Sequence, residues 1–310
     1  MRYIQDWLTK PDGQPGWTDY FLARGHECYI VDLPYQGRSA LGPPTTPPRR
    51  LRHFSAENAE QRFTAPKAFG LWPQAALHTR WPGSGRRGDA TFDRFFAAGA
   101  HLIDDAVFLQ EAARDALVAL VDRIARPVVL VGHSNGGPPL WLVADARPGS
   151  VRAVVALEPL GPAFANDTAG APADARPYGL TNIPITFDPP VNDPSVELKK
   201  VVRASNSSDL ADCMLQVEPA RGWPNLAGLP VLVVTGQASY HARYDWGTVE
   251  FLKQVGVDVE HLPLEAANIT GNGHFMFMET NSNDIAEKVD EWLQSKKPSH
   301  SHFRTIAPGS

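Results

Sequence analysis

Five short apolar runs rich in β-branched residues recur along the chain, separated by longer helical patterns. They occupy residues 28–31, 128–131, 151–157, 231–234 and 257–264, and the last run is the weakest. The first four do not alternate apolar with polar positions, which is typical of strands buried on both faces of a parallel sheet. The pattern predicts an α/β fold with a mostly parallel sheet flanked by helices.

Two amphipathic patterns predict helices beside this sheet. The first has apolar positions at i, i+3, i+4 and i+7, namely Leu117, Leu120, Val121 and Ile124. The second lies near the C-terminus, with apolar positions at Ile285, Val289, Trp292 and Leu293. We expect Ser282 or Asn283 to cap this last helix, and residues 296–310, which have no periodicity, to form a disordered tail.

Proline is concentrated in two parts of the chain. The sequence has 28 prolines in 310 residues, about 9% against a usual ~5%. They gather at about 40–95 and 160–228, where no sheet signal occurs. Loops this long inside a compact domain are usually functional. We therefore predict a single domain over residues 1–310 with two cap-like insertions above the sheet.

Composition and charge exclude several classes of protein. The chain is 43% hydrophobic and 20% charged, with a net charge of −5, so nothing favours a nucleic-acid partner. No apolar run approaches the ~20 residues that span a bilayer. Cys28 and Cys213 cannot form a disulfide scaffold or a zinc site of usual composition. Residues 2–7 lack the apolar part of a secretory signal, which favours the cytoplasm for the chain as it stands.

The strongest chemical signal is the G-x-S-x-G motif GHSNG at residues 132–136, directly after the second apolar run. A strand, a sharp turn and a helix in this order form a nucleophile elbow, which makes Ser134 the candidate nucleophile. Gly132 and Gly136 give the turn room, and His133 fills the variable position. The backbone N–H of Asn135 is the candidate oxyanion donor.

A serine nucleophile needs a base, and His274 is the best candidate. It lies in the glycine-rich turn 271–276, after the fifth run and before the last helix. In hydrolases of this type the order along the chain is serine, acid, histidine. His241, in the loop after the fourth run, and His261, within the fifth, are weaker candidates.

The acid that orients the base has two candidates. Most hydrolases of this kind place it after the fourth run, where the first carboxylate is Asp245. Glu158 instead follows the third run at once, at the carboxyl edge of the sheet where ligands bind in open α/β sheets. We prefer Glu158, which would accept the second imidazole N–H and stabilise the imidazolium.

Residues 32–39 form a D-x-x-x-x-G-x-S turn, and with residues 11–40, 131–137, 156–159 and 271–293 they carry a family resemblance. The chain resembles the α/β-hydrolase superfamily, in particular a bacterial esterase family with fungal relatives whose triad glutamate follows the strand after the nucleophile. The resemblance implies Ser134, Glu158 and His274 as the triad. It also implies carboxylic-ester hydrolysis, with no metal or organic cofactor and a small ester as the partner.

One departure from that family bears on activity. Families of this kind have further strands before residue 11, and a His-Gly loop whose backbone N–H is the second oxyanion donor. Neither occurs in this sequence, and losing one donor typically costs ~10²–10³ in turnover. The alternative to an esterase is therefore a non-catalytic or truncated hydrolase-like protein that binds a small molecule. A longer N-terminus would also allow secretion, and the oligomeric state stays open.

The two insertions also contain aromatic residues that suggest an apolar pocket for the acyl or alcohol group, although core packing explains half of them equally well. These aromatic residues are Phe63, Phe69, Trp72, Trp81, Phe92, Phe95 and Phe96.

Overall fold

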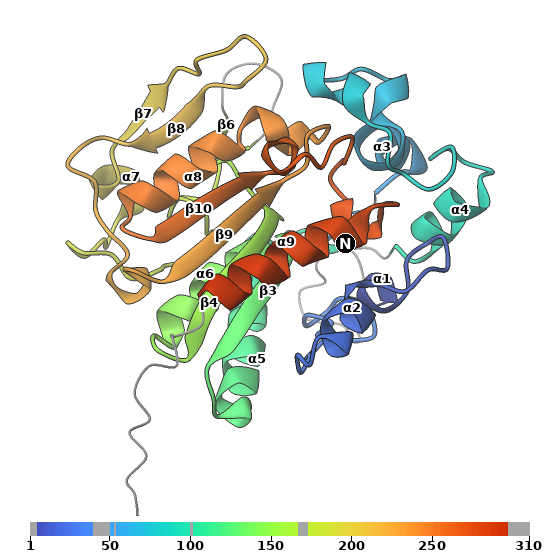
Figure 1. Cartoon of the computed structure of the whole chain (residues 1–310). Helices are drawn as coiled ribbons and strands as arrows, with labels where there is room; N and C mark the ends of the chain where they lie inside the picture. Colours follow the sequence, from blue (N-terminus) through green and yellow to red (C-terminus); the bar gives the residue numbers. More distant parts are fainter. Residues whose placement is uncertain (1–4, 40–49, 53, 100–101, 167–172, 297–310) are drawn as a thin grey trace, which may run out of the picture.

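A parallel sheet of four strands forms the centre of the protein (Figure 1). The computed structural model describes residues 5–39, 50–52, 54–99, 102–166 and 173–296. The strand order is β10-β9-β4-β3, with every neighbouring pair parallel. The strands are β3 (Val128–Ser134), β4 (Val151–Pro159), β9 (Pro230–Thr235) and β10 (Asp258–Pro263). All four therefore end at the same edge of the sheet.

Four of the five predicted strands are confirmed, and the prediction for residues 28–31 is wrong. That segment belongs to no sheet ladder in the described chain. Tyr29 is 50% exposed and Val31 is 40% exposed. The apolar run thus lacks the burial on both faces that an interior parallel strand requires.

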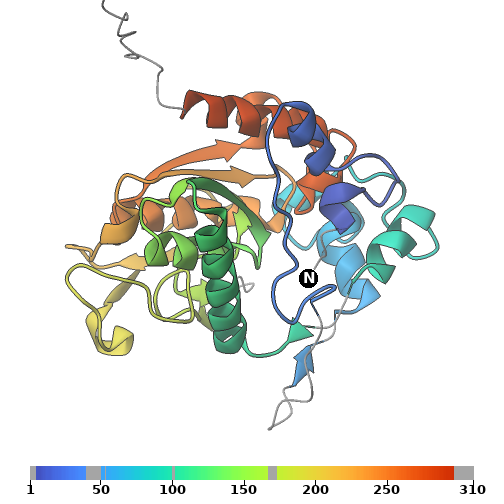
Figure 2. The same ribbon diagram turned by 90° about the horizontal axis from the view of Figure 1, so that it is seen from below.

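Helices cover both faces of the sheet, and alternate strand residues face each layer. Val154 and Ala156 pack with α5 (Ala106–Ile124), α6 (Gly137–Ala146) and α8 (Asp245–Gln254). Ala153, Val155 and Leu157 of the same strand pack with α2 (Trp17–Ala23), α4 (Ala90–Ala97) and α9 (Ser282–Ser295). Figure 2 shows α9 and α5 on opposite sides of the sheet. This three-layer arrangement explains why the two central strands, β4 and β9, are almost entirely buried, while the edge strands β3 and β10 are partly exposed.

The two predicted helices form, but the predicted cap of the second does not. Residues 117–124 are the last part of α5, and Leu117 and Val121 of the predicted apolar face pack into the core. The residue before α9 is Asn281, which makes no side-chain cap. Ser282 is buried inside the helix, and its carbonyl accepts a hydrogen bond from Trp17 Nε1 at 3.0 Å. Burial against α2 therefore sets the start of α9.

Short elements complete the described chain. The remaining helices are α1 (Gln5–Leu8), α3 (Ala56–Ala59) and α7 (Pro194–Glu197). Three antiparallel pairs join β1 (Leu51–Arg52) to β2 (Leu102–Ile103), β5 (Ala165–Asn166) to β6 (Ala173–Asp174), and β7 (Lys200–Arg203) to β8 (Cys213–Gln216). A π-helical turn, η1, spans Glu60–Thr64. The 3₁₀ turns are η2 (Pro66–Ala68), η3 (Pro73–Leu77), η4 (Pro224–Leu226), η5 (Tyr240–Arg243), η6 (Leu264–Ala267) and η7 (Met276–Met278).

The proline-rich segments consist of these short elements. The first holds β1, α3, η1 to η3 and most of α4, and the second holds β5 to β8, α7 and η4. Residues 40–49, 167–172 and the tail at 297–310 lie outside the described residues. The division into a core and two caps stays a prediction.

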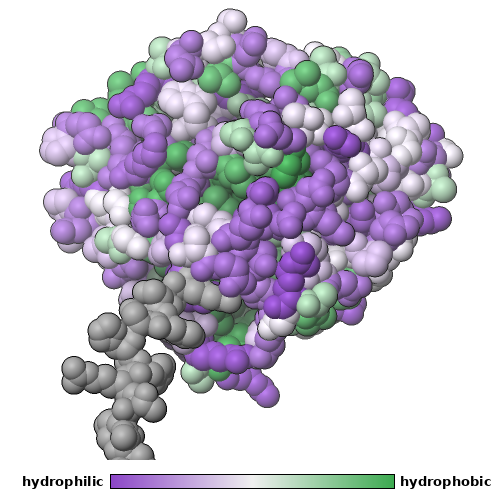
Figure 3. All heavy atoms as spheres, in the orientation of Figure 1, coloured by the Kyte–Doolittle hydropathy of each residue, from purple (hydrophilic) through white to green (hydrophobic). Residues whose placement is uncertain are grey.

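Polar side chains cover most of the face in Figure 3, with apolar ones between them. No helix in the described ranges is both long and apolar enough to cross a membrane.

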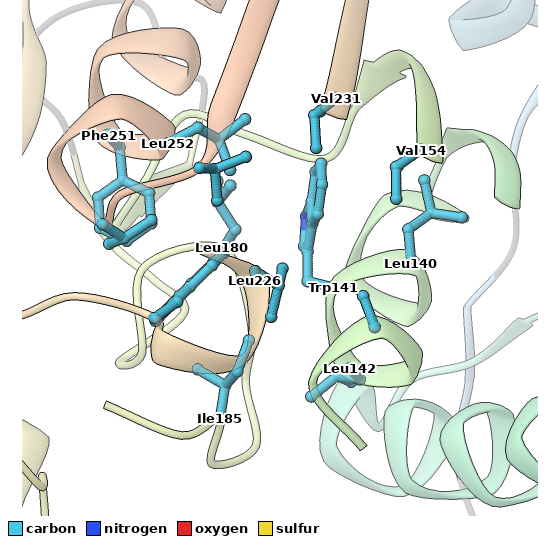
Figure 4. Close-up of a cluster of buried hydrophobic side chains, with 14 of the residues drawn as sticks. Leu140, Trp141, Leu142, Val154, Leu180, Ile185, Leu226, Val231, Phe251 and Leu252 are labelled. Atoms are coloured by element: carbon cyan, nitrogen blue, oxygen red, sulfur yellow. The ribbon is translucent and has the colours of Figure 1, made fainter. Parts of the chain in front are cut away.

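The core on the α6 side of the sheet is built around Trp141. Its side chain has no exposed surface, and in Figure 4 it lies between Val231 and Leu226. Removing a fully buried indole leaves a cavity that the neighbours fill only in part.

We expect Trp141→Ala to lower the free energy of unfolding by about 3–5 kcal/mol, measured by denaturant unfolding. Val196→Ala is the matched control, because Val196 is 66% exposed and its truncation should cost less than about 0.5 kcal/mol. Similar losses for the two variants would contradict the central place of Trp141 in this core.

Candidate active site

The turn after β3 holds Ser134 in a strained conformation. The φ of Ser134 is +54°, a region that residues other than glycine seldom adopt. A Cβ on Gly132 would lie 2.8 Å from the carbonyl oxygen of Gly136, so the turn is too tight for a side chain there. Helix α6 begins at Gly137, with proline in its first turn, as the elbow motif predicts.

The elbow also presents a free backbone donor. Among the described residues, the N–H of Asn135 donates to no protein oxygen. His133, on the other side of Ser134 in the sequence, has its Nε2 2.8 Å from the carbonyl oxygen of His274. The elbow therefore offers the Asn135 N–H as a donor for a developing oxyanion, and His133 links it to the loop that carries the predicted base.

Glu158 lies next to the elbow, near the end of the neighbouring strand. Ser134 pairs across the sheet with Pro159, the residue that follows Glu158. Glu158 has a φ of +43° and no exposed surface. Its Oε2 is 2.5 Å from His274 Nδ1, so the acid that we preferred from the sequence contacts the predicted base.

The loop after β9 supplies the other hydrogen bonds of the Glu158 carboxylate. Gly236 N–H donates to Oε1 and Ser239 Oγ donates to Oε2, each at 2.7 Å. With the Nδ1–H of His274, three donors converge on one carboxyl group, a set that suits its ionised form. Burial raises the pKa of Glu158 well above its ordinary value, and the charge of Asp245 adds to the rise. The hydrogen bonds from Ser239 and Gly236 oppose that shift.

His274 is almost fully buried among other rings. Its ring stacks on His241, with centroids 4.8 Å apart and planes 11° apart, and on Phe63 at 5.3 Å. Burial lowers its pKa well below the ordinary histidine value, and the neighbouring His133 and His241 act in the same direction. The imidazole is therefore neutral at neutral pH, the form that a general base needs.

In this structure Nε2 of His274 faces a phenol. Tyr240 Oη lies 3.3 Å from Nε2. Within the described chain, no hydrogen bond joins the Ser134 hydroxyl to His274. Catalytic hydrogen bonds are often long or misaligned until substrate binds.

The weaker sequence candidates, His241, His261 and Asp245, form a separate group beside this one. His241 Nδ1 lies 3.0 Å from Asp245 Oδ1. Thr235 Oγ1 donates to Asp245 Oδ2 at 2.8 Å and lies 3.0 Å from His261 Nε2. Asp245 therefore contacts His241 instead of His274.

Two features of the site were not foreseen from the sequence. The first is the set of contacts from Ser239 and Tyr240. Both residues follow β9 at the carboxyl edge of the sheet, so their polar side chains at that edge were the available signal.

The second is a buried carboxylate beneath the His274 loop. Glu279 accepts the N–H of Gly273 at 3.0 Å, contacts His78 Nε2 at 2.7 Å and accepts from Asn272 Nδ2 at 2.7 Å. Lys10 Nζ donates to the Glu279 carbonyl oxygen at 3.2 Å. No sequence motif indicates this group, since its members are far apart in the chain.

Glu158, His241 and His274 also have the chemistry of metal ligands. One potential ligand atom from each lies within 4.8 Å of the others. Two histidines and a glutamate are a known zinc set. Here, however, His274 Nδ1 and Glu158 Oε2 are hydrogen-bonded to each other, and an ion could bind both only by breaking that bond. The arrangement suits proton transfer better than metal binding.

Comparison with known proteins places the chain in a family. No family model matches it. The probable secreted lipase phiG of Fungal sp. (strain ATCC 74256) is 42% identical over 291 residues, which cover 94% of this chain and 78% of the lipase. The chain belongs to the lipase and esterase family. It is therefore a carboxylic-ester hydrolase by family.

The solved structure of a novel bacterial esterase has the same fold as this chain. The TM-score is 0.61 at 18% identity, covering 96% of this chain and 79% of the esterase. With the parallel sheet and its flanking helices, this likeness confirms the predicted α/β-hydrolase fold.

Replacing each of the two acids by its amide, in separate variants, tests which of them orients His274. Glu158→Gln keeps the size of the side chain but cannot stabilise an imidazolium, so we expect kcat to fall on the order of 10³-fold or more. Asp245→Asn should change kcat by less than about tenfold, because Asp245 contacts His241. Ester hydrolysis is measured for both, with thermal unfolding as the check on folding. The reverse order of effects would assign the acid to Asp245.

We expect the buried imidazole of His274, the predicted base, to set the acid limb of the pH profile. The base works only when deprotonated, so kcat/KM falls as pH drops through its pKa. Because burial lowers that pKa, we expect the midpoint to lie below about 6.5, the ordinary histidine value. The measurement is kcat/KM for an ester across acidic and neutral pH. A midpoint at or above the ordinary value would show that another group controls this limb.

Proposed function

We propose that the protein cleaves carboxylic esters through a Ser134–His274–Glu158 triad and an acyl-enzyme. The observation that carries the proposal is the 2.5 Å contact between His274 Nδ1 and Glu158 Oε2. It lies at the strand edge that also holds the G-x-S-x-G serine. A buried acid on one imidazole nitrogen fixes the tautomer whose other nitrogen can accept a proton.

The reaction follows from these groups. As Ser134 Oγ attacks the ester carbonyl, its proton passes to His274 Nε2, and Glu158 stabilises the resulting imidazolium. The Asn135 N–H donates to the oxyanion. His274 then protonates the leaving alcohol, and in the second half of the reaction it activates the water that hydrolyses the acyl-enzyme.

A small apolar ester is the proposed substrate class. Of the insertion aromatics, Phe63 stacks on His274 and Trp72 contacts the ring of Tyr240 at 5.9 Å. These two rings support an apolar group beside the reacting atoms. Trp81 and Phe95 pack edge to face at 4.9 Å, and Phe92 lies beside Phe95 in the same buried cluster, so these three serve the core. Phe69 contacts the Arg86 guanidinium at 4.9 Å and Phe96 stacks on Phe92 at 5.9 Å, so within the described chain neither ring contacts the catalytic group.

Export from the cell is part of the proposal. The similar lipase is a probable secreted protein, and this supports the secreted alternative over the cytoplasmic one.

A fluorophosphonate probe tests the nucleophile. It forms a covalent adduct only with a serine that a neighbouring base activates. We expect one adduct on the intact protein, located at Ser134 by peptide mass spectrometry and absent from Ser134→Ala.

Ser195→Ala is the control, because Ser195 is exposed on α7 and its variant should label like the wild type. An unlabelled protein that is stabilised by a small ester, with no turnover, would instead support the non-catalytic binding alternative.

A further inference from the structure

A phenol hydroxyl lies at the position where proton transfer takes place. Tyr240 Oη is 3.3 Å from Nε2 of His274. Since Nδ1–H donates to Glu158, Nε2 is an acceptor, and the Tyr240 hydroxyl donates to it in the resting enzyme. Any oxygen that later takes a proton from Nε2 must come within hydrogen-bond distance of the same atom. That oxygen therefore lies beside Tyr240 Oη.

The loop that presents Tyr240 is the one that holds the acid. Ser239 donates to Glu158 and also caps η5, the turn that begins with Tyr240. Trp72 Nε1 donates to the carbonyl oxygen of Ala238 at 3.0 Å, which anchors the loop from the other side. One short segment thus acts at both nitrogens of the His274 imidazole. Ser239 binds the carboxylate that contacts Nδ1, and Tyr240 places its phenol at Nε2.

The Tyr240 ring is also fixed by its neighbours. It packs edge to face on Trp72 at 5.9 Å and lies 4.9 Å from the ring of His274. The Arg62 guanidinium sits over its face at 5.1 Å, a cation–π contact. These contacts involve the ring alone, so a phenylalanine could keep them while losing the hydroxyl.

We propose that Tyr240 is a catalytic residue on the leaving-group side, and this rests on the proposed triad. When Ser134 attacks, Nε2 gains the serine proton and no longer accepts from the phenol. The Tyr240 O–H then donates to the ester oxygen of the leaving group instead. As the C–O bond breaks, that oxygen takes the bond pair and the Nε2 proton, and the Tyr240 hydrogen bond stabilises its negative charge without transferring a proton.

The same contact serves the second half-reaction. The water that attacks the acyl-enzyme gives its proton to Nε2, so it occupies the place that the leaving alcohol held. Tyr240 Oη then orients this water by hydrogen bonding. A polar contact that forms chiefly with the developing charge raises kcat more than it lowers KM.

Leaving-group chemistry separates this role from a structural one. Ethyl butyrate and p-nitrophenyl butyrate form the same acyl-enzyme, but the ethoxide oxygen develops far more charge than the delocalised p-nitrophenolate. For Tyr240→Phe we expect kcat/KM on ethyl butyrate to fall about 10- to 100-fold, the worth of a hydrogen bond to a charged group. On p-nitrophenyl butyrate it should stay within about threefold. Tyr20→Phe is the control, because Tyr20 lies on α2, outside the group of residues around His274.

Every other outcome overturns the proposal. Equal losses on both esters would assign Tyr240 a structural or oxyanion role. Unchanged rates on both would remove it from the reaction, and faster rates would show that the phenol obstructs Nε2. Ser134→Ala is assayed in parallel: if it hydrolyses both esters like the wild type, the triad itself is wrong, which is a different failure.

Discussion

The buried hydrogen bond between Glu158 and His274 is the constraint on which the rest of the site depends. A carboxylate with no exposed surface is costly unless every oxygen has donors. The fold satisfies this with one donor from the loop after β9 to each carboxylate oxygen, in addition to the imidazole. The path of that loop, its anchor on Trp72 and the position of Tyr240 all follow from the need to surround one charge.

Close approach of backbone is the second constraint. Two residues at the carboxyl edge, Ser134 and Glu158, have positive φ without being glycine. Such conformations are held only where surrounding contacts determine them, and they gather at functional sites. At Gly236, a Cβ would lie 3.2 Å from Glu158 Oε1 and 2.8 Å from the carbonyl oxygen of Asn272. The loop can therefore approach the acid closely only because this position is glycine.

The sequence predicted what is local or lies at strand ends. The elbow is encoded by consecutive residues, and Glu158 follows from the rule that parallel strands end at one edge. The strand predicted at 28–31 was wrong because a short apolar run does not reveal whether neighbouring strands or helices will cover it. The cap of α9 was misplaced because burial against Trp17 overrode the preference for a capping side chain. Tyr240 and Glu279 could not be assigned, since their roles come from contacts between segments far apart in the chain.

The carboxylate of Glu279 has a consequence for how the enzyme loses activity. This carboxylate joins the His274 loop to His78, and the backbone carbonyl oxygen of Glu279 accepts a hydrogen bond from Lys10. These partners lie outside the central sheet, in segments built of short helical turns. Proteins open locally before they unfold globally, and such segments open at lower free energy than core strands. On heating, the loop that carries His274 would therefore lose its contacts with Glu279 while the sheet is still folded. The enzyme would lose activity at a lower temperature than that of global unfolding.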